Sequence, residues 1–314
     1  MEAKRKAGWR PWRPPKQRNA RWRWTGFKGK TLWDWLQLLS ALAIPVVLAL
    51  AGFYFSSQQD ERQRLSEVRR AKSEQAIEEQ RAQDAALQAY LDQMSQLMLG
   101  GKLRDSEEDS EVRTLARART RTVLARLDGN RKGRVVQFLY EASLIDREQP
   151  VVSLSDVRLH GADLSHLDLS EANLSGAKLK DANLSSADLS DADLSGAKLK
   201  DADLHFSSIS GANMSGTYLN SANLSETDSI EADLSGADLS GAKLSGAFLR
   251  DVDLRETYLI ETNLSDTDLS DANLSDAIIR GANLRDARGV TDQQLEEQAK
   301  TLEDTTMPDG SIHH

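Results

Sequence analysis

The chain has 314 residues, of which 28% are charged and none is cysteine, and its formal net charge is -9. The lack of cysteine excludes a disulfide framework, a thiolate nucleophile and a cysteine-ligated metal site. The charge is uneven, because residues 1–30 carry eleven Lys/Arg and one Glu, a net charge of 11 - 1 = +10. This composition indicates a mostly solvated protein with a basic N-terminal tail, and it excludes one large globular core.

Residues 1–31 are predicted to be a disordered, basic, Trp-rich tail. The segments WRPWRPP and RWRW interleave Arg with Trp, a pattern suited to anionic lipid or to nucleic acid. An apolar segment follows directly, which favours a disordered tail that sets membrane topology while it lies on the inner leaflet. Anionic lipid is then the expected contact of the tail, and nucleic acid is not.

Residues 32–56 are predicted to form one transmembrane helix. No formal charge occurs in the twenty-five residues from Trp35 to Gln59. As a helix they reach roughly 37 Å, enough to cross a hydrocarbon core of about 30 Å. A cleavable signal peptide and a buried core helix are the alternatives. The basic tail predicts a cytoplasmic N-terminus, which would place the rest of the chain outside.

Residues 57–150 are predicted to form a helical stalk and a capping subdomain. Helices are expected at 57–99, 107–128 and 134–145, with Gly129 and Asn130 ending the second. From Leu87 to Met98 the apolar residues follow helical spacing and form a stripe that needs a partner. The two later helices can supply it. A parallel coiled coil between chains, and therefore a homo-oligomer, is the alternative.

The rest of the chain is dominated by a five-residue repeat. From Leu154 to Leu284 every fifth residue is Leu, except at four positions, which makes twenty-seven consecutive units; the exceptions are Ile209, Met214, Ser229 and Ile279. A period of five fits a short strand with its first and third side chains inward, followed by a polar corner. The predicted core therefore includes Leu154, Leu174, Leu194, Leu234, Leu254 and Leu274. At Ser229 a bulge is expected that turns Ile230 inward.

Units such as DANLS at 181–185 and GADLS at 236–240 follow the pattern A(D/N)LXX, and the segment resembles the pentapeptide-repeat family. The resemblance implies a mainly β fold: a right-handed quadrilateral parallel β-helix over 151–288, with four units and twenty residues per coil. The hexapeptide AKLKDA, present at 177 and again at 197, would then occupy one face in successive coils. Residues 289–314 are predicted to be a C-terminal cap and tail.

A twenty-residue coil sorts the outward side chains into four faces, two of which differ in charge. The acidic face comprises Asp168, Glu171, Asp188, Asp191, Asp228, Glu231, Asp251, Asp268 and Asp271. Opposite it lies the basic face, with Arg158, His160, Lys178, Lys180, Lys198, Lys200, Tyr218, Tyr258, Ile260, Ile278 and Arg280. Stacked like charges repel, so the lysines predict an anionic partner and the Tyr and Ile residues predict an interface. The alternative is that Asp181 and Asp201 neutralise the lysines and that the apolar residues are ordinary surface.

The sequence carries no constellation typical of an enzyme. The histidines of the repeat segment, His160, His166 and His205, do not share a twenty-residue offset, and Walker A, GxGxxG and HExxH motifs are missing. We therefore expect a non-enzymatic protein without metal or cofactor: a membrane-tethered module that presents a rigid rod to an unidentified protein partner.

The alternative function comes from the resemblance, since some pentapeptide-repeat proteins mimic duplex DNA and bind type II topoisomerases. Residues 151–288 contain 24 Asp/Glu and 11 Lys/Arg, a net charge of 11 - 24 = -13. Against mimicry, the inward positions hold Leu where those mimics often have Phe, and the apolar segment predicts a membrane anchor.

Overall fold

The computed structural model describes residues 31–100, 102–145 and 150–314. Apart from Thr31, the predicted basic tail and its lipid contact lie outside these residues. The chain divides into two compact units, Met1–Ala76 and Ile77–His314, which are described separately.

The first element, α1, runs without interruption from Leu32 to Leu99, and Pro45 lies inside it. At its start the Asp34 carboxylate accepts a hydrogen bond from the Thr31 N–H at 2.7 Å. In the first unit its side chains are exposed or half-buried, whereas in the second unit Leu87, Tyr90 and Met94 are buried. The apolar stripe that begins at Leu87 therefore has a partner within the chain.

That partner is a pair of short helices, α2 (Glu111–Leu124) and α3 (Gly129–Glu141). The Tyr90 hydroxyl lies 2.8 Å from the Thr120 hydroxyl in the core between α1 and α2, and burial raises the pKa of Tyr90. Arg131 of α3 forms an ion pair with Asp84 of α1 at 2.8 Å. The expected ranges 107–128 and 134–145 were wrong at both ends: α2 ends at Leu124, and α3 begins at Gly129. Gly129 begins a helix because Asp128 caps α3 by accepting from the Arg131 N–H at 2.9 Å.

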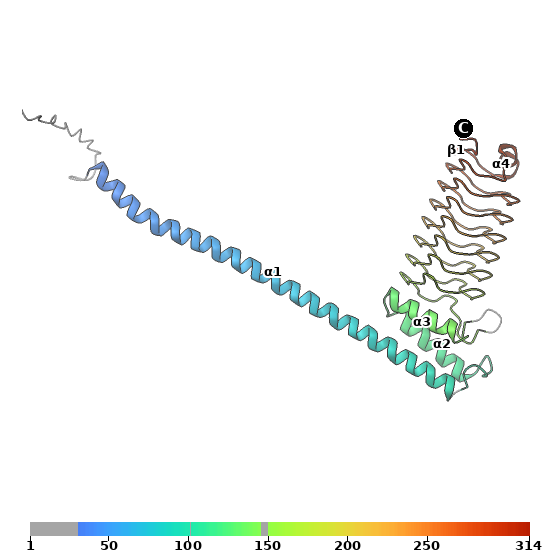
Figure 1. Cartoon of the computed structure of the whole chain (residues 1–314), viewed down its shortest axis with the longest axis horizontal. Helices are drawn as coiled ribbons and strands as arrows, with labels where there is room; N and C mark the ends of the chain where they lie inside the picture. The colour runs from blue at the N-terminus through green and yellow to red at the C-terminus, as the bar shows by residue number, and fades with distance from the viewer. Residues whose placement is uncertain (1–30, 101, 146–149) are drawn as a thin grey trace, which may run out of the picture. The chain divides into compact units, whose positions relative to one another are not determined.

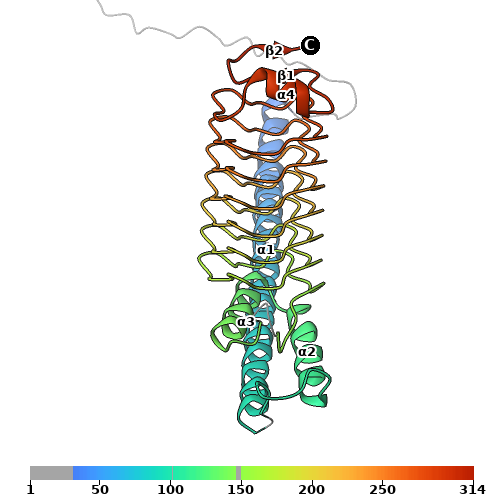
Figure 2. The same cartoon turned by 90° about the vertical axis from the view of Figure 1, so that its right-hand side faces the viewer.

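Successive coils of the repeat segment stack in parallel at an offset of twenty residues. The Leu179 N–H donates to the Lys198 carbonyl at 2.8 Å, and the Lys198 N–H donates to the Ala177 carbonyl at 2.8 Å. Each unit contributes a single bridged residue to the ladder, as in the pair Lys178 and Lys198. This explains why the rod contains few regular strands even though its coils are hydrogen-bonded from end to end (Figure 2).

The interior of the rod is a stack of Leu and small residues. The six leucines expected in the core, Leu154, Leu174, Leu194, Leu234, Leu254 and Leu274, are at most 1% exposed. The expected bulge at Ser229 is wrong. Ser229 is fully buried in a regular coil, and Ile230 is not buried. The Ser229 hydroxyl donates to the Thr227 hydroxyl at 3.0 Å, so the coil accepts a polar group without rearrangement.

The corners explain the outward consensus of the repeat. Where Asn or Asp precedes the Leu, its side-chain oxygen accepts from the backbone N–H two residues on, as Asn173 does from Ser175 at 3.1 Å. The next corner residue takes positive φ, which favours Gly, Asp and Asn. Phe206 is an exception, with φ 57° and an exposed ring.

Both ends of the coil stack are covered (Figures 1 and 2). At the first coil, the Gly129 carbonyl of α3 accepts from the Asp163 N–H at 3.0 Å, and the Lys132 ammonium donates to the His160 carbonyl at 2.7 Å. At Gly133 of α3 a Cβ atom would collide with the Asp163 carbonyl. Helix α3 thus satisfies an edge that would otherwise be open to another chain.

The C-terminal segment closes the last coil with α4 (Asp292–Gln298), β1 (Thr305–Thr306) and β2 (Ile312–His313). Strands β1 and β2 are antiparallel, and Thr306 bridges to Asn283 of the last coil. The Thr305 hydroxyl donates to the Ile279 carbonyl at 2.7 Å. Leu295 of α4 and Leu302 beyond it are buried. An end covered in this way has few free backbone groups to pair with a second rod.

Candidate functional site

The basic face is a column of side chains fixed by the coil ladder. Parallel bridges join Arg158 to Lys178 and Lys178 to Lys198. A second row one corner away contains His160, Lys180 and Lys200, all of which are exposed. Because neighbouring coils are about 4.8 Å apart, five basic side chains are concentrated within three coils. The rigid backbone holds these charges together despite their mutual repulsion.

The aspartates at the adjacent corner neutralise this column only in part. Lys180 lies 3.5 Å from Asp181, but both side chains are about half exposed, at 48% and 58%. Such a surface pair contributes roughly 0–1 kcal/mol. Within the described part of the chain, Lys178 and Lys200 form no ion pair. The ladder therefore presents unpaired positive charge.

In the upper coils the basic face changes from charged to aromatic and apolar. The Lys198 ammonium lies 5.9 Å from the centre of the Tyr218 ring, which marks the transition. Tyr258, Ile260, Ile278 and Arg280 follow at the expected offsets, with Tyr218 and Tyr258 exposed.

Sequence reasoning missed Asp238, which bridges to both Tyr218 and Tyr258 and separates the two rings. The twenty-residue offset that identified its neighbours was the available signal. Partial burial opposes ionisation of Asp238, but hydrogen bonds from Ser240 and Asn220 outweigh it and lower the pKa of the carboxyl. The Ser240 hydroxyl donates to Asp238 at 2.7 Å. The face therefore carries one acidic group between its two tyrosines.

The acidic face consists of two rows of side chains. In the first row Asp168 bridges to Asp188, and in later coils Asp228 and Asp268 alternate with Ser208, Phe248 and Arg288. The second row is interrupted once, by Gly211, and contains Glu171, Asp191, Glu231, Asp251 and Asp271. Burial opposes ionisation of Asp168, yet hydrogen bonds from Ser170 and Tyr140 lower its pKa overall. Phe248 is 53% exposed. The row of Asp168 thus begins with two carboxylates, and in later coils it alternates carboxylates with side chains of other kinds.

His160 links the basic column to the helical cap through its surroundings. Desolvation lowers the pKa of His160, and the nearby charges of Lys132, Lys178 and Lys180 lower it further. As the pH falls below the unfolded value of about 6.5, the unfolded chain takes up this proton before the folded chain does. Protonation therefore destabilises the folded state in acid.

We expect His160→Asn to reduce the loss of stability between pH 7.5 and pH 5.5. The measurement is the apparent melting temperature of wild type and variant at both pH values. A decrease in the variant as large as that of the wild type would show that His160 does not contribute.

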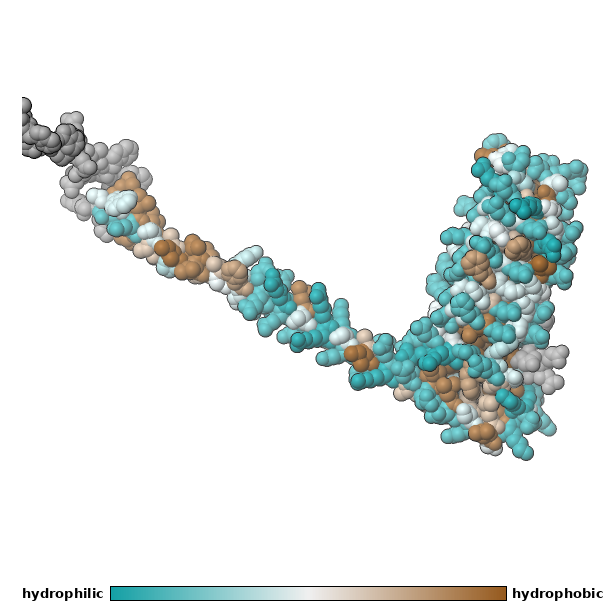
Figure 3. Space-filling model, in the orientation of Figure 1, coloured by the Kyte–Doolittle hydropathy of each residue, from teal (hydrophilic) through white to brown (hydrophobic). Residues whose placement is uncertain are grey.

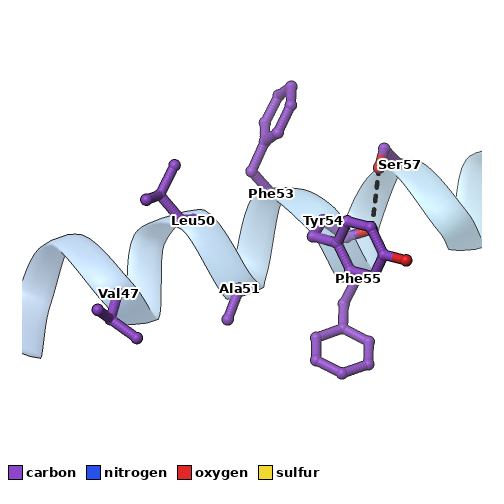
Figure 4. Close-up of a pocket in the computed structure, with 7 residues that line it drawn as sticks. All are labelled: Val47, Leu50, Ala51, Phe53, Tyr54, Phe55 and Ser57. Carbon is purple, nitrogen blue, oxygen red and sulfur yellow. Dashed lines mark hydrogen bonds between the residues drawn. The ribbon is translucent and has the colours of Figure 1, made fainter.

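No group of three or more His, Asp or Glu in the described ranges could hold a metal ion. A hollow on α1 is lined by Val47, Leu50, Ala51, Phe53, Tyr54, Phe55 and Ser57. Its side chains radiate from a single helix, and the only polar contact drawn is the Ser57 hydroxyl donating to the Tyr54 carbonyl at 2.9 Å (Figure 4). This hollow is a mostly apolar helix surface, and its side-chain polar groups are the hydroxyls of Tyr54 and Ser57.

Comparison with known proteins identifies the rod. The family model of pentapeptide repeats matches eight times, over residues 153–191, 177–216, 187–225, 212–251 and 249–286. The coiled segment of this chain is a pentapeptide-repeat domain. Such repeats form a right-handed β-helix, and the family consists in general of non-enzymatic structural or interaction proteins. A search of curated protein sequences finds no match.

Several solved structures are similar to the pentapeptide-repeat domain. A trypsin-treated variant of QnrB1, a plasmid-mediated fluoroquinolone resistance protein, is 23% identical, with a TM-score of 0.38 over 43% of this chain and 70% of its own. HetL from the cyanobacterium Nostoc is 28% identical, with a TM-score of 0.21 over 57% and 98%. A protein of the Arabidopsis thaliana thylakoid lumen is 25% identical, with a TM-score of 0.22 over 49% and 85%.

Proposed function

We propose that this protein is a non-enzymatic, membrane-tethered interaction module, in which α1 spans the membrane once and the pentapeptide-repeat domain is presented to a protein partner. One observation carries the tether: α1 contains an apolar window of 18 residues, none of which is buried in the protein. Phe53 is 76% exposed and Leu50 is 64% exposed. Apolar side chains gather over this part of α1 (Figure 3).

A continuous apolar surface of this kind is rare on soluble monomers and is stable when lipid covers it. Trp33, Trp35 and Tyr54 flank the window, which suits amphipathic rings at the two headgroup layers. The same window also fits a signal sequence or a buried core helix, but its lack of burial favours lipid over a protein core. The helix also continues without a break past Ala51, where a signal peptidase would cut.

The interaction role rests on the exposed faces of a rigid rod. The coil ladder fixes side chains in columns, so the domain can present charges and rings with little loss of conformational entropy on binding. The basic face supplies both the unpaired lysines and the exposed tyrosines of such a surface. The DNA-mimic alternative is less well supported, because a phosphate-like surface needs continuous acids. The row that starts at Asp168 is interrupted at Ser208, Phe248 and Arg288, and the row that starts at Glu171 is interrupted at Gly211.

Membrane topology can be tested with single cysteines, because the chain has none of its own. Ser221 is an exposed corner residue of the rod, and Ala7 lies before α1. We expect a membrane-impermeant maleimide to label Ser221→Cys in intact cells and to label Ala7→Cys only after lysis. This pattern would support a single span with the rod outside.

The opposite pattern would place the rod in the cytoplasm, which would retain the tether and reverse the orientation. Labelling of both cysteines in intact cells, or recovery of the full chain in the soluble fraction after lysis, would contradict the single-span tether. Each cysteine is the control for the other, because both variants need to label in lysed cells for the comparison to count.

A further inference from the structure

We propose that the basic face binds the acidic face of a second copy of this chain, so that neighbouring rods line up side by side. The proposal rests on the proposed function, because a shared membrane would concentrate the copies and favour parallel axes. Its physical basis is the arrangement of charge on two opposite sides of one rod.

The charges match level by level. Opposite faces of one coil are ten residues apart, so Arg158 lies opposite Asp168, and Lys178 lies opposite Asp188. Two parallel rods can meet at equal height, with the basic column of one against the acidic column of the other. Paired side chains then differ in height along the rod axis by half a coil, or about 2.4 Å. Over the first two coils each base faces an acid.

The upper coils match in a different way. There the basic face contains the exposed Tyr218 and Tyr258, and the acidic face contains the exposed Phe248 with the half-buried Ile230 beside it. The ten-residue offset that pairs Arg158 with Asp168 places Tyr218 opposite Asp228 and Tyr258 opposite Asp268. Tyrosine hydroxyls facing carboxylates would therefore add hydrogen bonds above the charge pairs, with Phe248 lying between the two aspartates.

Other arrangements of two copies are disfavoured by charge. A two-fold contact through the basic faces would bring lysine columns together, and a contact through the acidic faces would bring Asp168, Glu171 and Asp188 together. Like charges in contact oppose both encounter and binding. Among contacts made by the basic and acidic faces, charge favours the one between unlike faces, and it leaves one basic and one acidic face free in each pair. Such head-to-tail association extends into an open row.

The test uses the full chain in detergent, carrying either of two affinity tags, with capture of one tagged form by the other as the readout. Both variants use residues that occur naturally at the same position of the five-residue unit elsewhere in the rod. The basic-face variant carries Lys178→Asn, Lys180→Ser, Lys198→Asn and Lys200→Ser. The acidic-face variant carries Asp168→Asn, Glu171→Ser and Asp188→Asn. Asn keeps the side-chain oxygen that accepts from the Ser170 and Ser190 N–H groups.

We expect wild type to capture wild type at low salt and capture to decline toward 1 M salt, where the screening length falls to about 3 Å. Each variant is expected to lose capture of itself by at least tenfold. Mixing the two variants should restore capture, because one basic face and one acidic face remain intact, and the product should stop at a dimer in sedimentation.

Three results would overturn the proposal. Equal capture in every combination would mean that α1 or the helical region drives association. Loss of capture in the mixture, with unchanged melting of both variants, would exclude pairing between unlike faces. No capture of wild type by itself would leave the lysine column to an acidic partner of another kind. Detergent removes any dependence on membrane orientation, so these outcomes are separate from those of the maleimide experiment.

Discussion

Leu194→Asp is expected to unfold the pentapeptide-repeat domain. Leu194 is fully buried between neighbouring coils, so the substitution would place a carboxylate among Leu and Ala side chains without a partner. Leaving a buried charge unpaired costs several kcal/mol, which exceeds the usual effect of a point substitution. Far-UV circular dichroism in detergent would show loss of the cooperative transition, and limited proteolysis would cut within residues 151–288.

Leu194→Met is the matched control for this variant. Met214 occupies the same place one coil above and is fully buried, so the rod accepts that side chain. A volume-conserving change of this type costs less than about 1.5 kcal/mol. Melting of Leu194→Asp close to that of Leu194→Met would contradict the inward orientation of position 194.

Gly133→Ala is expected to destabilise the cap on the first coil, although the same change inside an exposed helix would be stabilising by about 1 kcal/mol. A Cβ atom at Gly133 would meet the Asp163 carbonyl, which is backbone and is held in place by the coil. Helix α3 would have to move away and weaken the bond from the Asp163 N–H to the Gly129 carbonyl. We expect a net loss of about 1–3 kcal/mol.

The measurement is the apparent melting temperature, in which the loss corresponds to several degrees for a domain of this size. Arg134→Ala is the control, because Arg134 is an exposed neighbour on α3 and its replacement should have little effect. Gly129→Ala tests the same contact independently, since its Cβ would meet the Gly161 carbonyl. An increase in the melting temperature of either Gly variant would show that α3 does not pack on the coil as closely as described.

The two substituted positions differ in how well the sequence predicts their burial. Leu194 belongs to a strict five-residue period, and this period predicts that each residue at its position points into the rod. Gly133 has no such pattern around it. In the sequence Gly129 predicts a helix stop, and the reason for a glycine there becomes evident only when the first coil lies against α3.

Local reasoning also failed inside the repeat. Ser229 predicted a bulge, but its hydroxyl finds the Thr227 hydroxyl and the coil stays regular. The backbone bonds of adjacent coils hold each unit in register more strongly than one polar side chain can disturb it. At the surface, Asp238 differs in charge from the basic and apolar residues of its face, but its offset of twenty residues from Tyr218 places it in the same column.

The sequence by itself determined the period, the inward Leu positions, the existence of faces of different charge and the apolar segment of α1. These follow from spacing and composition, which local geometry converts directly into a side-chain direction. The tertiary structure alone decided how the two ends are closed and that Ser229 is accommodated. The two ends are closed by contacts between segments remote in sequence, such as Gly129 with Asp163. Local sequence patterns do not predict the energy of such contacts.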